Sequence, residues 1–324
     1  MNNEAPLLEV KNLKKHFQLR KGFWGRQSSV VRAVDNVSLA INTGETLGLV
    51  GESGCGKTTA GRALLRLIEP TSGEVLYRGT DILKVSSQDL RRYRRKLQIV
   101  FQDPYSSLNP RITVGGMLRE ILQFHKLATG KKINERVDEL LNTVGLAPEY
   151  ASRYPHEFSG GQRQRIGIVR ALAVDPEFLV LDEPVSALDV SIQAQILNLL
   201  KDLQKQFNLS YLFISHALSV VDHIAHNTAV MYLGRVVESG ITSSIVSEPL
   251  HPYTKALIAA VPRPDPSERH IREPLAGDVP NSMNPPSGCH FHPRCPVATK
   301  DCSSWEYSLK ELTDGRKVAC IRYQ

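Results

Sequence analysis

The spacing of apolar residues divides the chain into stretches with different predicted structures. Apolar and polar residues alternate in "LLEVKNLKKHFQLR" and "VVRAVDNVSLAI", which predicts two strands of an antiparallel β layer near the N-terminus. The segment between them, residues 21–29, contains Gly, Arg and Ser and is expected to be an exposed loop. The chain is therefore expected to begin with a β layer.

A compact apolar run opens the next predicted region. "ETLGLV" predicts a buried strand, and "GESGCGKTTAGRALLRLIEP" predicts a glycine-rich loop that leads into an amphipathic helix ending before Pro70. From about Asp103 to Gly167 the pattern turns helical, with apolar residues three and four apart in "INERVDELLNTVGL" and Gly145 as the stop. We expect an inserted helical lobe here.

Two later apolar runs, "FLVLDEP" and "YLFISH", flank the predicted helix "SIQAQILNLLKDLQKQF". This order is typical of parallel strands joined by a crossover helix, and polar groups then gather at the carboxyl ends of the strands. From Glu248 onward prolines crowd the sequence and predict a linker into a small C-terminal extension. The pattern as a whole predicts an α/β protein.

Composition narrows the class of protein. A chain of 324 residues with 41% hydrophobic content can fill the core of one large domain or two ordinary ones. No apolar run approaches the roughly 18 to 20 residues that span a bilayer, and the N-terminus lacks a signal-peptide pattern, so a cytosolic location is expected. The net charge is +7, and the basic run "RRYRRK" is expected to be a solvated helix face because no aromatic platform for nucleic acid accompanies it.

The strongest chemical signal is "GESGCGKT", Gly51–Thr58, which fits the phosphate-loop pattern G-x-x-x-x-G-K-[ST] between a predicted strand and a predicted helix. Glycines allow successive backbone N–H groups to turn toward a polyphosphate, and the start of the helix adds its positive dipole end. Lys57 would bring a positive charge to the terminal phosphates, and the hydroxyl of Thr58 would reach Mg²⁺. This motif predicts nucleotide binding.

A second signal lies at the end of "FLVLDEP", where an apolar strand delivers Asp182 and Glu183. The first carboxylate suits Mg²⁺, and the second can orient or deprotonate an attacking water. Alone, such a pair would be an ordinary surface edge. Together with a phosphate loop it indicates nucleotide hydrolysis.

"FSGGQRQR", Phe158–Arg165, resembles the signature sequence of ABC ATPases. Other elements of that family match in order: Gln102 resembles the Q-loop, "SALD" the D-loop and His216 the switch histidine. The resemblance implies an ABC-type P-loop ATPase fold with a RecA-like parallel sheet core, an antiparallel β subdomain and an inserted helical subdomain. It places the nucleotide-binding domain at residues 1–250, with the helical subdomain at about 103–167, and the cysteine-containing extension at 251–324.

The resemblance also implies roles for individual residues. It implies ATP binding by Phe17, as the aromatic on adenine, and by Gly51, Glu52, Ser53, Gly54, Cys55, Gly56, Lys57, Thr58 and Thr59. It implies Mg²⁺ ligation by Thr58, Gln102 and Asp182, catalysis by Glu183 as base with His216 and Gln102, binding of the opposite subunit's ATP by Ser159, Gly160, Gly161 and Gln162, and a D-loop contact by Asp189. The sequence departs from the family at Phe158, where leucine is usual, and at Ala217, where aspartate is common.

A narrower resemblance covers nearly the whole chain. "IVFQDPYSSLNPR", "EPVSALDVSIQAQILNLL" and "HPYTKALIAAVP" look like the ATP-binding subunits of bacterial dipeptide and oligopeptide permeases, and the insertion "RKGFWGRQSS" resembles the second of their two ATPases. This implies ATP-driven peptide import by a heterodimer of this chain and a sister ATPase with two permease subunits, fed by an extracytoplasmic binding protein. The expected place is the cytoplasmic face of the inner membrane, with the permease docking after Gln102 and no nucleic acid involved.

Four of the five cysteines lie in the C-terminal tail: Cys289, Cys295, Cys302 and Cys320. The fifth, Cys55, lies in the phosphate loop and is expected to contribute only its backbone. The tail spacing, C-x5-C-x6-C-x17-C, lacks the C-x2-C pairs of small zinc modules. By resemblance a [4Fe-4S] cluster ranks first, zinc second, with His290 or His292 as a substitute ligand, and unligated thiols third.

Two alternative functions are compatible with the sequence. The same machinery could import nickel or another small solute, since nothing in this chain should contact the cargo. A soluble ABC ATPase acting on DNA or ribosomes ranks lower, because such proteins generally carry two nucleotide domains or a long coiled-coil insertion.

Overall fold

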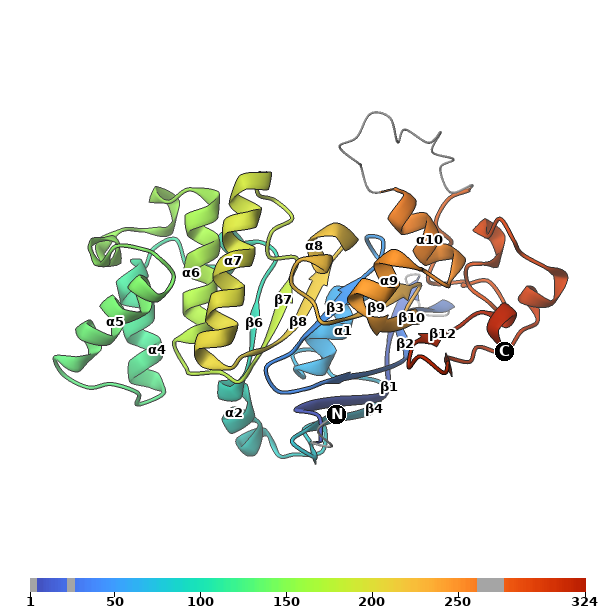
Figure 1. Cartoon of the computed structure of the whole chain (residues 1–324). Helices are drawn as coiled ribbons and strands as arrows, with labels where there is room; N and C mark the ends of the chain where they lie inside the picture. The colour runs from blue at the N-terminus through green and yellow to red at the C-terminus, as the bar shows by residue number, and fades with distance from the viewer. Residues whose placement is uncertain (1–4, 22–26, 261–276) are drawn as a thin grey trace, which may run out of the picture. The chain divides into compact units, whose positions relative to one another are not determined.

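A computed structural model of the chain describes residues 5–21, 27–260 and 277–324, which belong to two compact units (Figure 1). Unit 1 comprises Met1–Asn42, Thr46–Lys84 and Ile214–Gln324, and unit 2 comprises Thr43–Glu45 and Val85–Phe213.

The elements assigned to unit 1 are β1 Leu8–Lys21, β2 Gln27–Ile41, β3 Thr46–Val50, α1 Lys57–Leu64, β4 Ser72–Tyr77, β5 Thr80–Asp81, α8 Leu218–Asp222, β9 Asn227–Tyr232, β10 Arg235–Ile241, α9 Thr242–Ser247, α10 Pro252–Ala259, β11 Lys310–Glu311 and β12 Lys317–Val318, with 3-10 helices at His292–Arg294, Lys300–Ser303 and Ile321–Tyr323. Those of unit 2 are α2 Ser87–Lys96, β6 Leu97–Val100, α3 Pro104–Ser107, α4 Val114–Phe124, α5 Lys132–Thr143, α6 Gly160–Leu172, β7 Phe178–Asp182 and α7 Val190–Phe207, with 3-10 helices at Pro148–Ser152 and Pro155–Glu157. Strand β8, Ser210–Ser215, belongs to unit 2 up to Phe213.

The N-terminal β layer of unit 1 is antiparallel, as predicted. Its strands lie in the order β2-β1-β4-β5, and Leu8 of β1 pairs with Ile41 of β2 and with Tyr77 of β4. The predicted loop at residues 21–29 is too long, because β1 and β2 remain paired as far as Lys21 and Gln27. The centre of that segment, residues 22–26, lies outside the described residues.

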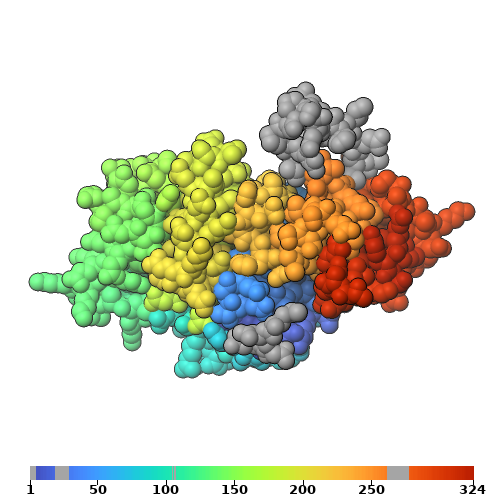
Figure 2. All heavy atoms as spheres, in the orientation of Figure 1, coloured from blue at the N-terminus to red at the C-terminus, as the bar shows by residue number. Residues whose placement is uncertain are grey.

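The other sheet strands of unit 1 lie in the order β11-β12-β10-β9-β3. Strand β3 is buried throughout and pairs in parallel with β9, which pairs antiparallel with β10. The C-terminal extension adds β12 to the outer side of β10, with Glu238 opposite Val318. The extension therefore continues the sheet of unit 1, and Figure 2 shows its surface beside that of residues 230–260.

The stretch after Glu248, predicted to be a linker, contains helix α10. Pro252 stands in the first turn, where its missing N–H costs nothing, and the ring Nδ1 of His251 accepts a hydrogen bond from the N–H of Tyr253. The buried carboxylate of Glu238 accepts hydrogen bonds from the N–H groups of Leu250 and His251. Proline can start this helix because Pro252 has no N–H to satisfy and His251 caps the N–H of Tyr253.

Unit 2 carries the predicted helical lobe, from α3 to α6, with α4 and α5 packed against each other (Figure 1). Gly145 follows α5 with φ 68°, which confirms it as the helix stop. Strands β6 and β7 pair in parallel, with β8 next to β7. Of the basic run predicted to be a solvated face of α2, Arg91, Arg92 and Arg94 are exposed, whereas Arg95 and Lys96 are half-buried.

A membrane-spanning helix is not found in residues 5–21, 27–260 and 277–324, where no helix is both long and apolar enough.

Candidate nucleotide-binding site

The phosphate loop of unit 1 leaves β3 at Gly51 and enters α1 at Lys57. Gly56 has φ 107°, a left-handed conformation that side chains with a Cβ rarely adopt, and a Cβ there would collide with the carbonyl oxygen of Ala33. At Gly51 a Cβ would collide with the carbonyl oxygen of Met231. The loop is thus a close-packed backbone cradle that only glycine permits at these two positions, as a polyphosphate site requires.

The side chain of Lys57 folds back into this cradle. It is 4% exposed, and its Nζ donates hydrogen bonds to the carbonyl oxygens of Gly51 and Glu52 at 2.7 and 2.9 Å. The ammonium group therefore lies inside the loop, where it can meet phosphate oxygens.

The remaining loop residues differ in exposure. Ser53 and Gly54 are exposed, and Thr58 and Thr59 are half-buried at the start of α1. Cys55 is 5% exposed, and burial raises the pKa of its thiol. The thiol is withdrawn from the surface.

His216 follows β8 in unit 1 and is exposed. Ala217 stands where aspartate is common in the family. The hydroxyl of Ser215 accepts a hydrogen bond from the N–H of Ala217 at 3.0 Å and donates one to the carbonyl oxygen of Ala217. A serine two residues earlier therefore supplies an oxygen partner for the N–H of Ala217, the residue that caps α8.

Phe17 lies on β1, half-buried, opposite Val31. The Nζ of Lys15 lies over its ring, 4.9 Å from the centroid. The ring is therefore partly covered, and its contact with adenine stays a prediction.

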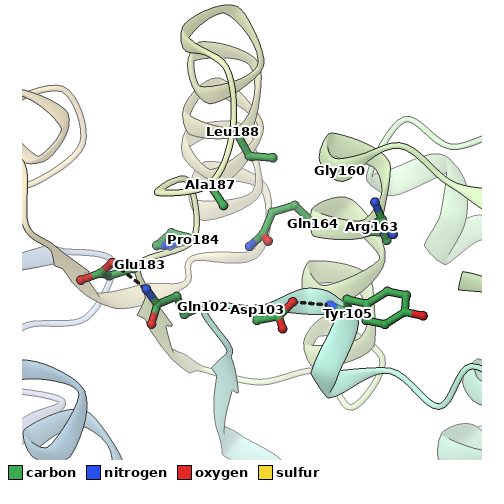
Figure 3. A pocket seen from close by; sticks show the side chains of 10 residues that line it. All are labelled: Gln102, Asp103, Tyr105, Gly160, Arg163, Gln164, Glu183, Pro184, Ala187 and Leu188. Carbon is green, nitrogen blue, oxygen red and sulfur yellow. Dashed lines mark hydrogen bonds between the residues drawn. The ribbon is translucent and has the colours of Figure 1, made fainter. Parts of the chain in front are cut away.

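The carboxylates of unit 2 stand where β7 ends. Asp182, the last residue of the strand, is 1% exposed, and Glu183 follows with φ 47°, a left-handed conformation for a residue with a side chain. The side-chain amide of Gln102, just after β6, donates a hydrogen bond to Oε2 of Glu183 at 2.9 Å (Figure 3). Gln102 and Glu183 therefore meet at the carboxyl edge of the two parallel strands.

The signature residues form the start of α6. The hydroxyl of Ser159 accepts a hydrogen bond from the N–H of Gln162, whose side-chain oxygen accepts one from the N–H of Ser159. This capping box leaves Ser159 and Gly160 exposed at the positive end of a 13-residue helix. Phe158 is 4% exposed and packs edge-on against Tyr150. The phenylalanine that replaces the family's usual leucine therefore fills part of the core of the helical lobe.

The signature, the Q-loop and the D-loop border a single hollow of unit 2 (Figure 3). Its lining residues are Gln102, Asp103, Tyr105, Gly160, Arg163, Gln164, Glu183, Pro184, Ala187 and Leu188. Asp189, the N-cap residue of α7, follows and is exposed. Arg163 and Gln164 lie within the signature run and were given no role from the sequence, and Tyr105 was expected only as part of the segment that receives the permease. The guanidinium of Arg163 lies 5.6 Å from the centroid of the Tyr105 ring.

The oxygen donors assigned to Mg²⁺ are the hydroxyl of Thr58 in unit 1 and the side chains of Gln102 and Asp182 in unit 2. Hydroxyl, amide and carboxylate oxygens form a hard donor set that suits Mg²⁺. Among the described residues, no group of three or more His, Cys, Asp or Glu side chains could hold a metal ion by itself.

The four cysteines of the tail line one pocket of unit 1 together with Phe291, His292 and Thr299. All four thiols are free, and burial together with the three neighbouring thiols raises the pKa of Cys289 to about 11. His290 lies apart from this pocket, with its Nδ1 3.3 Å from the carbonyl oxygen of Leu233. Of the two histidines considered as substitute ligands, His292 is therefore the one beside the cysteines.

Known proteins resemble this chain along nearly its whole length. The ABC transporter family model matches residues 34–186, and the model of the oligopeptide/dipeptide transporter C-terminal region matches residues 237–302. The "Oligopeptide transport ATP-binding protein AppF" of Bacillus subtilis is 51% identical over 324 residues, covering 99% of this chain and 98% of AppF. The "Probable peptide ABC transporter ATP-binding protein y4tS" of Sinorhizobium fredii is 54% identical over 314 residues, covering 97% and 89%.

A solved structure shares the fold. The ATP-binding cassette MJ0796, determined as a dimer in a post-hydrolysis state with ADP and Pi, aligns with a TM-score of 0.64 at 28% identity, covering 72% of this chain and 98% of the cassette. This likeness confirms the predicted fold class.

Proposed function

Because the chain belongs to the ABC transporter family of peptide-transport ATP-binding proteins, we propose that it hydrolyses ATP to power the import of di- and oligopeptides through a membrane permease. The observation that carries the ATPase part is the pairing of Gln102 with Glu183 at the end of β7. The peptide part is carried by the C-terminal region, which matches the oligopeptide/dipeptide transporter model.

Unit 1 supplies the phosphate-binding groups of this proposal. The backbone N–H groups of residues 51–56 would surround the phosphates, and Lys57 would exchange its carbonyl partners for phosphate oxygens. Phe17 would stack on adenine, and Thr58 would hold Mg²⁺ with Gln102 and Asp182. Bound Mg²⁺ neutralises charge on the phosphate oxygens during phosphoryl transfer.

Unit 2 supplies the base. Glu183 would accept a proton from the attacking water, and the hydrogen bond from Gln102 would orient its carboxylate. His216 is assigned to the same reaction as the switch histidine. Water attack then yields ADP and inorganic phosphate.

The exposed signature residues are available to contact a second subunit. Ser159, Gly160, Gly161 and Gln162 lie at the open end of α6, where N–H groups and the helix dipole favour an anion. We assign that anion to ATP held by a sister ATPase, with Asp189 at the same interface. Two permease subunits and an extracytoplasmic binding protein would complete the importer, with this chain on the cytoplasmic face of the inner membrane.

The domain division follows from this assignment. Residues 1–250 would form the nucleotide-binding domain, with residues 103–167 as its helical subdomain, and residues 251–324 the extension. Residues 103–110, which include the exposed Tyr105, would receive the permease.

We also assign a [4Fe-4S] cluster, with zinc as the alternative, to Cys289, Cys295, Cys302 and Cys320. The support is that all four cysteines line one pocket, although no three or more of the described His, Cys, Asp or Glu side chains are already arranged to hold a metal ion in this structure. Four thiolates can ligate either group, and a four-iron cluster separates them more widely than one zinc ion does. The bound cluster or zinc ion would hold together a proline-rich tail that has little apolar core of its own.

Anaerobic purification followed by iron, sulfide and zinc assays tests this assignment. About four irons and four sulfides per chain, lost in Cys302→Ser but kept in Cys55→Ser, would support the cluster. Stoichiometric zinc would select the alternative, and metal-free protein would refute both.

Uptake assays in cells with and without the gene test the cargo. Loss of di- and oligopeptide uptake with normal nickel uptake would support the proposal. Loss of nickel uptake alone would refute the peptide assignment.

A further inference from the structure

A side chain from the cysteine-rich extension contacts the phosphate loop. Arg294, one residue before Cys295, forms a two-pronged ion pair with Glu52: Nη1 lies 3.0 Å from Oε2, and Nη2 lies 3.3 Å from Oε1. The Arg294 side chain is 7% exposed and that of Glu52 is 26% exposed. Paired, partly buried arginine–carboxylate contacts of this kind have defined geometry, so the extension has a specific grip on the loop.

The backbone of Glu52 is held at the same time. Its N–H donates a hydrogen bond to the phenolic oxygen of Tyr253 at 2.9 Å, and its carbonyl oxygen accepts one from Nζ of Lys57. The three polar parts of Glu52, the side chain, the N–H and the carbonyl, are therefore each bound by a different residue. Of these three partners, Arg294 is the one that comes from the cysteine-rich part of the C-terminal extension, described over residues 277–324.

A buried aromatic cluster holds the groups that grip Glu52. The ring of Phe291, 1% exposed, lies 5.3 Å from that of Tyr232 and 5.4 Å from that of Tyr253, measured between centroids. Arg294 also lies against the hydroxyl of Tyr232, and Cys289 and Cys295 pack on the cluster. The position of Arg294 thus depends on the same segment that carries two of the four thiols.

We propose that Arg294 is a positioning residue for the phosphate loop, so that the affinity for MgATP depends on the C-terminal extension. The ion pair holds the second residue of the loop, and with it the direction of the neighbouring N–H groups that face the phosphates. An ion pair that only stabilised the fold would leave nucleotide affinity unchanged. This inference rests on the proposed assignment of residues 51–58 to ATP.

Equilibrium binding of MgATP to the full-length chain tests the proposal. Arg294→Gln should raise the Kd about tenfold, which corresponds to about 1.4 kcal/mol, and Arg294→Lys should recover part of that loss. In the background of Glu52→Gln, the change Arg294→Gln should alter the Kd less than about twofold, because the effect is transmitted through the pair.

Arg316→Gln is the matched control. Arg316 is another arginine of the extension, 11% exposed, and it binds Asp314 and the carbonyl oxygen of Glu248. Both substitutions should lower the melting temperature, but only Arg294→Gln should change the Kd.

Two results would overturn the inference: a Kd for Arg294→Gln equal to that of the unsubstituted chain, or a tenfold loss that persists in the Glu52→Gln background and so reflects direct attraction between Arg294 and phosphate. Failure of the unsubstituted chain to bind MgATP, with Lys57→Ala no different, would instead refute the nucleotide site and the inference with it.

Discussion

The hydrogen bond from the amide of Gln102 to Oε2 of Glu183, 2.9 Å long, joins the residues that follow two adjacent parallel strands. Glu183 has φ 47°, and a left-handed conformation costs a residue with a Cβ about 1 to 2 kcal/mol. Such strain is typical of positions where the surrounding structure holds a functional side chain. The pair borders the hollow that also contains Gly160 of the signature (Figure 3).

Replacing the base should stop hydrolysis and spare binding. Glu183→Gln keeps the size of the side chain and an oxygen that can accept the bond from Gln102, but it cannot take a proton. We expect kcat of the assembled transporter to fall by about 100-fold or more, with the Kd for MgATP within about twofold. Single-turnover hydrolysis and equilibrium binding measure the two quantities.

Glu177→Gln is the control for this substitution. Glu177 lies just before β7, where Glu183 lies just after it, and it forms an ion pair with Lys96. Its loss should leave kcat unchanged. A kcat for Glu183→Gln equal to that of Glu177→Gln would show that the base lies elsewhere.

Two glycines of the phosphate loop should differ in their tolerance of a methyl group. Gly54→Ala meets open space, so it should cost only the strain of its left-handed backbone, about 1 to 2 kcal/mol. Gly56→Ala meets the carbonyl oxygen of Ala33 as well, and should cost at least about 3 kcal/mol. Denaturant unfolding measures both, and equal costs would contradict the tight cradle described for Gly56.

Ser159 should matter for hydrolysis beyond its role as a helix cap. Ser159→Ala removes the cap of α6 and should cost about 1 kcal/mol of stability. Thr113→Ala is matched to it, because the hydroxyl of Thr113 caps α4 by accepting a hydrogen bond from the N–H of Gly116. ATPase activity of the assembled dimer should fall only in Ser159→Ala. Equal activities of the Ser159→Ala and Thr113→Ala dimers would show that Ser159 acts only as a helix cap.

Phe17 should contribute to binding through its aromatic face. Stacking of a base on an aromatic ring is worth about 1 to 3 kcal/mol, so Phe17→Ala should weaken MgATP binding by about fivefold or more. Phe17→Trp, which keeps an aromatic face, should bind within about threefold of the unsubstituted chain. If Phe17→Ala bound MgATP as tightly as the unsubstituted chain, another residue would have to contact adenine.

Local patterns predicted the elements that carry the site. The apolar run ending at Asp182 and the glycine-rich run before Lys57 are continuous segments whose structure depends on neighbouring residues. The stop at Gly145 is local as well. Such features can be predicted because each is complete within a few residues of sequence.

Features set by distant partners were missed. The strands β1 and β2 extend into the predicted loop because each supplies the other's hydrogen bonds. Helix α10 forms among prolines where Glu238 binds the N–H groups of Leu250 and His251, just before the helix begins. The pair between Glu52 and Arg294 joins residues 242 positions apart. The residues next to Glu52 or Arg294 in the sequence do not predict that the two side chains form a pair.

Uptake of a labelled oligopeptide tests the proposed peptide import most directly. The complete transporter is placed in lipid vesicles supplied with ATP, with Glu183 or with Gln at position 183 of this chain. We predict ATP-dependent accumulation of peptide with Glu183 and none above background with Glu183→Gln. Equal accumulation by both complexes would contradict the assignment of this chain as the ATPase that powers peptide import.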